Sequence, residues 1–187
     1  MQTEVLPVLT RDCDLGKDML ELGPGPGAAT EWLRHKVANL TAVEVDAEAA
    51  DLLADRYEGT NVQIVTGSAA KLAYPNASFD SVGSFTMLHH VPTLAMQNAI
   101  LAEAFRVLRP GGVLIGSDSL PGNDLHHFHA DDTYNPVDPA SIVSRLQTLG
   151  FATITVMVDY MLRFIATKPE PQQTQPATGD SPTGDAA

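Results

Sequence analysis

The chain has 187 residues, of which 44% are hydrophobic, and a formal net charge of -12. This length and composition predict one domain with a single core, and no apolar run approaches the roughly 18 residues that a membrane span needs. An acidic surface repels phosphate backbones, so a nucleic-acid substrate is disfavoured. Cys13 is the single cysteine, which excludes intrachain disulfides and cysteine-based metal clusters. The N-terminus lacks the pattern of a signal peptide, so we expect a cytoplasmic location.

The first predicted strand, 18–22, runs into a glycine-rich loop. Near the end of the strand stands a carboxylate, Glu21. Three glycines follow at alternate positions, Gly23, Gly25 and Gly27. Glycines let the backbone turn sharply and let a ligand approach closely, and the helix predicted over 30–37 supplies an N-terminus. The loop therefore predicts a floor for a small nucleoside-like cofactor.

Two classes of cofactor fit this loop. Gly23, Gly25 and Ala28 also satisfy the dinucleotide pattern G-x-G-x-x-G/A, in which a helix N-terminus faces a pyrophosphate. The carboxylate of Glu21 would repel a pyrophosphate but would suit a ligand that carries an ammonium group. S-adenosylmethionine is such a ligand, so Glu21 favours it over a dinucleotide.

A second carboxylate ends the next predicted strand, 40–45. Glu44 lies about 20 positions after Gly23, close to the spacing of the ribose-binding acid in nucleotide folds. One carboxylate can accept hydrogen bonds from two vicinal hydroxyls. Asp46 competes for this role, although its position is more typical of the cap of a helix over 47–57. We therefore assign the ribose to Glu44.

The rest of the chain continues the alternation of strands and helices. Further strands are predicted at 62–66, 81–85 and 113–117, with a helix over 93–108 before the last of them. Such alternation forces parallel pairing through right-handed crossovers.

The predicted elements after 117 differ from this alternation. A helix is expected over 139–149, and two strands, 152–158 and 161–167, follow with a short link between them. A short link permits only antiparallel pairing. We therefore expect a mostly parallel sheet that ends in an antiparallel hairpin.

Several short motifs lie along the chain in a specific order. They are Leu-Glu-Leu-Gly-Pro-Gly-Pro-Gly at 20–27, Val-Glu-Val-Asp at 43–46, Ser-Phe-Asp-Ser-Val at 78–82, Met-Leu-His-His-Val at 87–91 and Arg-Val-Leu-Arg-Pro-Gly-Gly-Val-Leu at 106–114. Together they resemble the class I S-adenosylmethionine-dependent methyltransferases, specifically the small single-domain enzymes typified by quinone-biosynthesis methyltransferases. Each motif alone is weak, but their order and intervals are specific, and the resemblance covers about residues 18–167.

The resemblance implies an α/β fold, with a Rossmann-like seven-stranded methyltransferase sheet and helices on both faces. It also implies that Glu21 and the loop from Gly23 to Gly27 hold the methionine part of S-adenosylmethionine. Glu44, with Val45 beside it, would bind the ribose.

The adenine is expected at Ser68 and Ala69, in the turn after the third strand. The family usually has an acidic residue at the position of Ser68, to hydrogen-bond the adenine amino group. A neutral acceptor is roughly half as strong as an ionised one. The sequence therefore predicts a modest cofactor affinity.

The resemblance also suggests a division of the chain. The methyltransferase domain is predicted over 18–168, after a short N-terminal segment, 1–17, and before a tail, 169–187, whose polar composition predicts disorder. Relatives commonly have helices before the first strand that cover the cofactor. The run 5–9 is a candidate remnant of such a helix, and the polar segment 119–138 is a candidate cover at the ligand edge of the sheet.

His89 and His90 are candidate catalytic residues. They follow the fourth strand, where the family places the methyl acceptor, and an imidazole there could orient or deprotonate that acceptor. Packing or a contact with the cofactor is the alternative role.

Segment 119–138 carries a second group of histidines, His126, His127 and His129, near two aspartates. The segment either lines the substrate pocket, with His126 and His129 as further candidate bases, or is a plain surface loop. A divalent metal site is disfavoured because nothing fixes these side chains on one face of a regular element. We therefore expect no metal.

These observations predict methyl transfer from S-adenosylmethionine to an oxygen, nitrogen or carbon atom of a small molecule. Phe-Thr-Met-Leu at 85–88 is not the Asn/Asp-Pro-Pro-Tyr signature of enzymes that methylate planar amides or exocyclic amines. The alternative is a catalytically inactive S-adenosylmethionine-binding subunit that regulates or accompanies another protein. A nicotinamide oxidoreductase is disfavoured, because no tyrosine has a lysine four residues further on.

Overall fold

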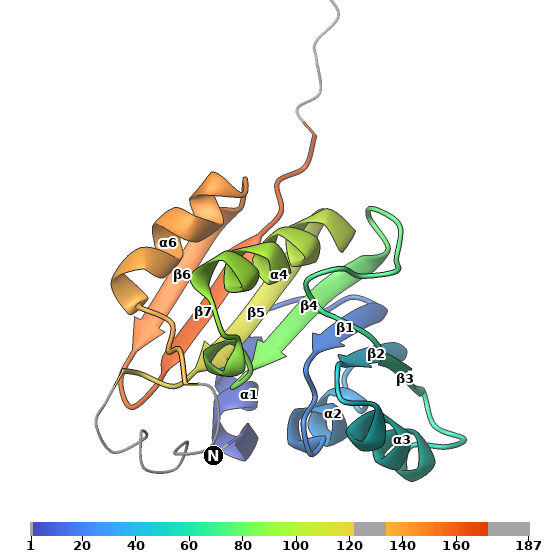
Figure 1. Ribbon diagram of the computed structural model, residues 1–187. Coiled ribbons are helices and arrows are strands. Elements are labelled where there is room, and N and C mark those ends of the chain that lie inside the picture. The colour runs from blue at the N-terminus through green and yellow to red at the C-terminus, as the bar shows by residue number, and fades with distance from the viewer. Residues whose placement is uncertain (1, 122–133, 172–187) are drawn as a thin grey trace, which may run out of the picture.

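The computed structural model describes residues 2–121 and 134–171, with side chains from Val5 onward. These residues form a seven-stranded sheet with helices on both faces (Figure 1). The strand order is β3-β2-β1-β4-β5-β7-β6, in which β7 is antiparallel to both of its neighbours. The expected fold, a mostly parallel sheet that ends in an antiparallel hairpin, is thereby confirmed.

Three parallel strands form one half of the sheet, β1 (Asp18–Leu22), β2 (Asn39–Glu44) and β3 (Val62–Thr66). They are connected by α2 (Ala28–Leu33) and α3 (Ala47–Arg56). Helix α2 begins earlier than the sequence predicted, because Gly27 adopts a left-handed conformation with φ 81° and its carbonyl accepts the Glu31 N–H at 3.0 Å. Helix α3 is capped as predicted: the Asp46 carboxylate accepts the Ala49 N–H at 3.0 Å.

The other half contains β4 (Phe79–Phe85), a 3₁₀ turn (Leu88–His90), α4 (Leu94–Val107), β5 (Leu108–Asp118), α6 (Pro139–Thr148), β6 (Ala152–Val158) and β7 (Leu162–Thr167). Strand β5 is longer than the predicted 113–117. Leu108 already pairs with Phe79, and the register then shifts before Val113 pairs with Ser81. The Pro-Gly-Gly run at 110–112 hides this extension in the sequence, because proline and glycine disfavour strands.

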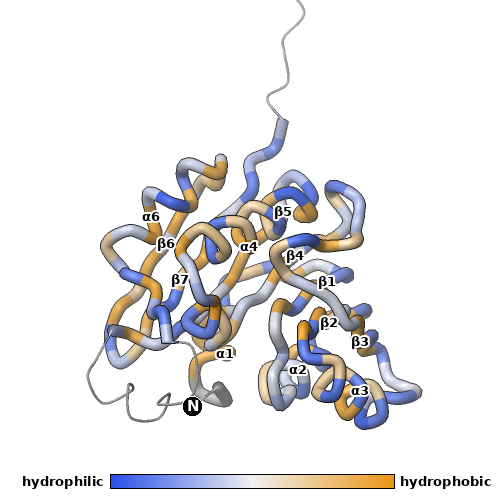
Figure 2. The backbone as a smooth tube through the Cα atoms, viewed as in Figure 1, coloured by the Kyte–Doolittle hydropathy of each residue, from blue (hydrophilic) through white to orange (hydrophobic). Residues whose placement is uncertain are grey.

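Two apolar layers enclose the sheet, and the apolar segments concentrate along its strands (Figure 2). On one face α4 and α6 pack through Leu101 and Leu146 against Leu114 and Phe164, all of which are buried. The opposite face is covered by α2 and by α1 (Gln2–Thr10). Val5, Leu6 and Leu9 of α1 are almost completely buried there. The run 5–9 therefore belongs to a helix that packs on the sheet.

Two cationic side chains join elements at the edge of the sheet opposite the carboxyl ends of the parallel strands. Arg109 Nη1 lies 3.0 Å from Asp18 Oδ2 and 2.5 Å from Asp80 Oδ1. Lys168 Nζ donates to the carbonyls of Phe105 and Leu108, at 2.8 Å and 2.7 Å. This second set of bonds ties the end of β7 to the junction between α4 and β5.

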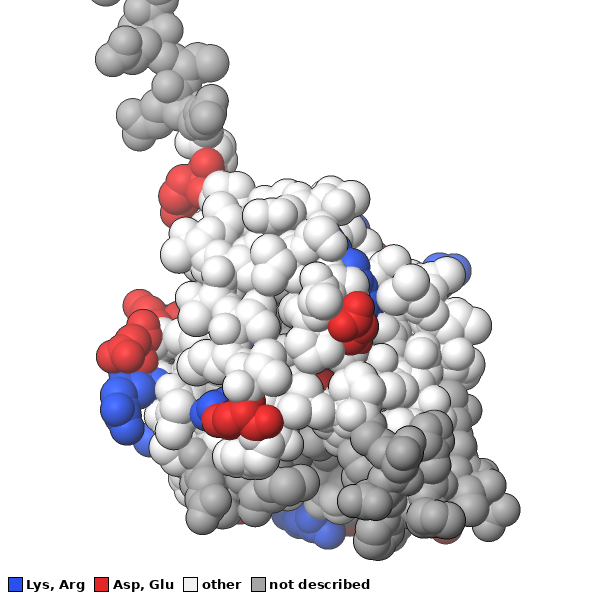
Figure 3. Space-filling model, turned by 90° about the vertical axis from the view of Figure 1, so that its left-hand side faces the viewer, with Lys and Arg blue, Asp and Glu red and all other residues white. Residues whose placement is uncertain are grey.

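Within residues 2–121 and 134–171, no helix has the length and apolar character needed to cross a membrane. Charged side chains are few and scattered on the side of the molecule formed by α6 and β6 (Figure 3). The exposed apolar side chains include Val158, at the end of β6, and Tyr160, in the turn between β6 and β7.

Candidate functional site

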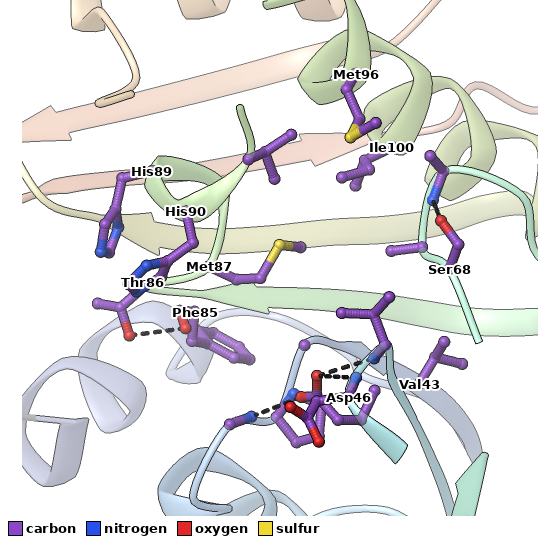
Figure 4. Close-up of a pocket in the computed structure, with 18 of the residues that line it drawn as sticks. Val43, Asp46, Ser68, Phe85, Thr86, Met87, His89, His90, Met96 and Ile100 are labelled. Atoms are coloured by element: carbon purple, nitrogen blue, oxygen red, sulfur yellow. Dashed lines mark hydrogen bonds between the residues drawn. The ribbon is translucent and has the colours of Figure 1, made fainter. Parts of the chain in front are cut away.

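A cavity of about 850 Å³ lies at the carboxyl ends of the parallel strands (Figure 4). Its walls are formed by the segments that directly follow β1, β2, β3, β4 and β5, and by the first turns of α4. Ligands bind at this edge in open α/β sheets, and cavities of roughly 300–1,000 Å³ hold small organic molecules.

The glycine loop forms one wall of the cavity through Gly23 and Gly25, whose φ angles are 62° and 52°. The Gly23 N–H donates to the Val43 carbonyl at 2.9 Å, which holds the loop against β2. A Cβ on Gly23 would lie 2.4 Å from Met87 Cγ, whereas a Cβ on Gly25 would meet nothing within 4 Å. Gly23 therefore permits close packing, and Gly25 leaves the space that a ligand needs.

Glu44 ends β2 and borders the same cavity. Its Oε2 accepts the Gly25 N–H at 3.2 Å, and its Oε1 accepts the Val45 and Asp46 N–H groups at 2.8 Å and 3.1 Å. The side chain is fixed by three backbone donors: Oε1 already accepts two of them, and Oε2, which accepts one, can accept a further hydrogen bond. Val45, the next residue, lies at the rim and is 73% exposed.

The expected adenine turn lies beside Glu44. The Gly67 N–H donates to the Glu44 carbonyl at 2.8 Å, and Ser68 and Ala69 line the cavity. Ser68 Oγ accepts the Ala70 N–H at 3.3 Å. In Figure 4, Ser68 lies on the side of the cavity opposite His89 and His90.

Glu21 and Gly27 do not line the cavity, unlike the other residues that the sequence assigned to the cofactor. Glu21 is 1% exposed and its Oε2 accepts the Thr30 hydroxyl at 2.7 Å. Burial raises the pKa of Glu21 to about 7; the hydrogen bond from Thr30 opposes this rise, and the nearby Glu44 adds to it. Gly27 begins α2, and its carbonyl accepts the Tyr57 hydroxyl at 3.1 Å. Both residues therefore stabilise the glycine loop without lining the cavity.

The segment after β4 contributes Thr86, Met87, His89 and His90 to the cavity. Thr86 has a positive φ of 52°, and its N–H donates to the Ser117 carbonyl at 2.7 Å. A β-branched residue rarely adopts this conformation, and such strain concentrates at functional sites. No feature of the sequence had indicated this conformation of Thr86.

The two adjacent histidines lie in different environments. His90 is exposed at the cavity, whereas His89 is 4% exposed. Their ring centroids are 4.1 Å apart. His89 Nδ1 lies 2.5 Å from Oδ1 of Asp118, a buried residue that sequence reasoning missed. The available signal was a carboxylate directly after the predicted 113–117 strand, at the edge that also holds His89.

The segment 119–138 is described only at its two ends, so His126, His127 and His129 lie outside the described residues. At one end Ser119 lines the cavity. At the other end the Tyr134 ring lies 6.0 Å from the His89 ring, and its hydroxyl donates to the Leu120 carbonyl at 3.1 Å. Both ends therefore meet beside His89. In the described part of the chain, no three His, Cys, Asp or Glu side chains gather to hold a metal ion.

Residues 20–116 match the sequence profile of a methyltransferase domain. A probable S-adenosylmethionine-dependent methyltransferase of Mycolicibacterium smegmatis is 32% identical over 73% of this chain and 52% of that protein. A fatty-acid O-methyltransferase of the same organism is 30% identical over 59% of this chain and 40% of that protein. The chain spans about half the length of the curated relatives it matches.

The fold also matches a solved methyltransferase. Phosphoethanolamine N-methyltransferase 2 of Haemonchus contortus, in complex with S-adenosyl-L-methionine, superposes with a TM-score of 0.73 and 15% identity, over 90% of this chain and 53% of that one. The chain therefore belongs to the class I S-adenosylmethionine-dependent methyltransferases. The expected family is confirmed, and the narrower likeness to quinone-biosynthesis enzymes stays a prediction.

Proposed function

We propose that this protein binds S-adenosylmethionine in the cavity and transfers its methyl group to a small apolar molecule. The observation that carries this proposal is the arrangement of Glu44, the Gly23–Gly25 loop and Ser68 around one cavity of about 850 Å³. These groups match, in order, the ribose, the methionine part and the adenine of one extended cofactor. We assign this function to residues 18–168, onto which α1 packs.

Glu44 is the ribose-binding residue in this proposal. Its carboxylate is already oriented by Gly25, Val45 and Asp46 N–H groups, so binding costs little side-chain entropy. Ser68 and Ala69 face the adenine, and Gly23 and Gly25 allow the methionine part to approach the backbone. Glu21 acts from below the loop through its charge, which attracts a cationic ligand when the carboxyl group is ionised.

The methyl acceptor is assigned to the part of the cavity between the histidines and α4. Its walls there are largely apolar, formed by Phe85, Met87, Val91, Met96 and Ile100. An apolar wall favours an apolar acceptor, because burial removes its surface from water. The similarity to a fatty-acid O-methyltransferase supports the apolar character of the acceptor and does not specify its reacting atom.

Methyl transfer requires mainly that the protein align the acceptor with the methyl group of the cofactor. Methyl transfer is an in-line displacement from a cationic sulfonium, and a neutral thioether leaves. A cavity that aligns the acceptor with the methyl carbon and excludes water therefore supplies most of the catalysis. A base is required only where the acceptor carries a proton at the reacting atom. The acceptor atom is oxygen, nitrogen or carbon.

A second candidate function is that of an inactive S-adenosylmethionine-binding subunit. The observation that favours it is Ser68, an exposed neutral side chain where the family usually has an acid. Weak binding of the adenine would suit a subunit that senses the cofactor or stabilises a partner and does not catalyse methyl transfer.

Two measurements test the proposal. Calorimetry should detect binding of S-adenosylmethionine and S-adenosylhomocysteine, and no binding of NAD under the same conditions. The protein is then incubated with S-adenosylmethionine labelled in the methyl group and with cell extract, which is separated into organic and aqueous phases. Label in the organic phase is the expected result. Cofactor binding without label in any product would favour the inactive subunit. Label only in aqueous products other than S-adenosylmethionine would exclude an apolar acceptor.

A further inference from the structure

Asp118 and His89 form a buried pair at the end of the cavity. Nδ1 of His89 lies 2.5 Å from Oδ1 of Asp118, and their side chains are 5% and 1% exposed. The parallel pairing of β4 with β5 brings them together, since Phe85 at the end of β4 pairs with Ser117 on β5. His89 also lines the cavity, whereas Asp118 does not. Among the described residues, His89 is the titratable side chain through which Asp118 can act on a ligand.

Several hydrogen bonds hold the two residues in place. The Ser119 N–H donates to Asp118 Oδ1 at 2.7 Å, and the Asn135 N–H donates to the His89 carbonyl at 2.7 Å. Gln97 Nε2 donates to the carbonyls of Leu88 and Asn135, at 2.9 Å and 2.8 Å. The imidazole thus has a fixed backbone on one side and a fixed carboxylate on the other.

With Asp118 ionised, this geometry places the proton of a neutral His89 ring on Nδ1. An ionised carboxylate only accepts hydrogen bonds, so the contact at 2.5 Å requires a proton on His89 Nδ1. In the neutral imidazole, Nε2 is then the acceptor. Asp118 Oδ2 is buried and has no hydrogen-bond partner among the described residues. A positive charge on the adjacent imidazole would compensate this buried carboxylate more fully than a neutral ring does.

We propose that Asp118 is a positioning residue that presents His89 Nε2 as the proton acceptor for the methyl acceptor. The inference rests on the proposed function and narrows its substrate class to molecules with a hydroxyl or amine at the reacting atom. A carboxylate acceptor is already ionised at neutral pH and needs no base.

The step conserves atoms and charge. The oxygen or nitrogen of the acceptor attacks the methyl carbon, and its bond to that carbon forms as the carbon–sulfur bond breaks. The bonding electrons go to sulfur, which becomes a neutral thioether. The proton of the acceptor moves to His89 Nε2, and the resulting imidazolium is stabilised by Asp118. The imidazolium later releases this proton to water.

The tautomer of His89 can be measured directly in the full chain. In protein labelled with ¹⁵N-histidine, long-range ¹H–¹⁵N correlations at mildly alkaline pH separate a ring with the proton on Nδ1 from one with the proton on Nε2. His89 is assigned by loss of its signals in His89→Gln, with His90→Gln as the matched variant. We expect Nδ1–H in the wild-type protein. The proton on Nε2, or on both nitrogens, would overturn the proposal without any further variant.

Two substitutions separate the effects of the tautomer and the charge. Asp118→Ala removes the acceptor, so His89 should lose the fixed Nδ1–H tautomer. Asp118→Asn can keep the bonds from Ser119 and His89 on its carbonyl oxygen, so the tautomer should persist without the charge. An unchanged tautomer in Asp118→Ala would contradict the proposal. If Asp118→Ala does not fold, the wild-type spectrum still decides the tautomer.

Turnover is measured on the extract fraction that the wild-type protein methylates. We expect Asp118→Ala to lower kcat by about 100-fold while KM for S-adenosylmethionine changes little, as for loss of general-base assistance. Asp55→Asn, an exposed residue of α3 that does not line the cavity, is the matched control and should leave kcat unchanged. An Asp118→Ala protein with wild-type kcat would refute the role of Asp118. Absence of cofactor binding in the wild type would instead refute the proposed function. The tautomer of His89 is measured without the cofactor, so that result would not depend on this outcome.

Discussion

Glu44 and Gly25 are joined by a hydrogen bond between the Glu44 carboxylate and the Gly25 N–H, at 3.2 Å. The bond connects the end of β2 to the glycine loop after β1, so the two segments that the sequence assigned to the cofactor form one preassembled wall. Because backbone donors fix the carboxylate, a bound ribose would meet a side chain that is already ordered.

Loss of the Glu44 carboxylate should weaken cofactor binding. In Glu44→Ala the charge-assisted hydrogen bonding to the ribose is lost together with the bond that holds the Gly25 N–H, so we expect S-adenosylmethionine binding to weaken by ~2 kcal/mol or more. Calorimetric titration measures this change. Glu48→Ala, in the first turn of α3 and away from the cavity, is the control and should bind as the wild type does. Equal affinities of the two variants would place the ribose elsewhere.

An acid at the adenine turn should tighten binding. Ser68 lines the cavity and is exposed, so the longer side chain of Ser68→Asp has room. If this position contacts the adenine amino group, an ionised acceptor should strengthen binding by about 1 kcal/mol. Ser68→Ala removes the acceptor and should bind S-adenosylmethionine more weakly than the wild type or Ser68→Asp does. Weaker binding by Ser68→Asp, with an unchanged circular dichroism spectrum, would count against the contact.

The sequence predicted most of the fold because each element carries its own signal. The strands 18–22, 62–66 and 152–158 have the predicted bounds, since each is a compact run of apolar and β-branched residues next to turn residues. The bounds of β5 differed because Leu108 pairs with Phe79 across a register shift, a long-range effect that local composition does not contain.

The site was predictable only where one segment carries the chemistry. Glu44 was predicted from its spacing after the glycine loop and Ser68 from the family resemblance, and both line the cavity. The pair of His89 with Asp118 depends on two strands that lie side by side in the sheet and far apart in the chain. The burial of Glu21 beneath the loop also depends on how α2 packs, which its motif does not specify.

Lys168 should contribute to stability through its hydrogen bonds to the end of α4. Lys168→Met leaves the carbonyls of Phe105 and Leu108 without their donor, and burial already lowers the pKa of this amine. An unsatisfied buried carbonyl costs about 1–3 kcal/mol, so we expect a loss of that order in the free energy of unfolding. Urea denaturation measures it. Lys71→Met replaces an exposed lysine and should change stability by less. An equal effect of both substitutions would show that the bonds add nothing.

Glu21 should make stability depend on pH. Burial raises its pKa from 4.5 to about 7 in the folded state. Below about pH 4.5 the carboxyl group is protonated in both states, so it does not favour unfolding. As the pH rises toward 7, the unfolded chain ionises this group while the folded protein still resists ionisation, and the folded state loses relative stability. At one pKa unit per 1.36 kcal/mol, the loss amounts to about 3 kcal/mol above pH 7.

Glu21→Gln should therefore be more stable than the wild type at pH 8 and equally stable at pH 4. The amide can still accept the Thr30 hydroxyl, and it has no charge to bury. Urea denaturation of both proteins across this range measures the difference, which should grow as the pH rises through the interval between 4.5 and about 7. Glu48→Gln, on the exposed start of α3, should show no such trend. A difference that is constant with pH would mean that Glu21 titrates normally in the folded protein.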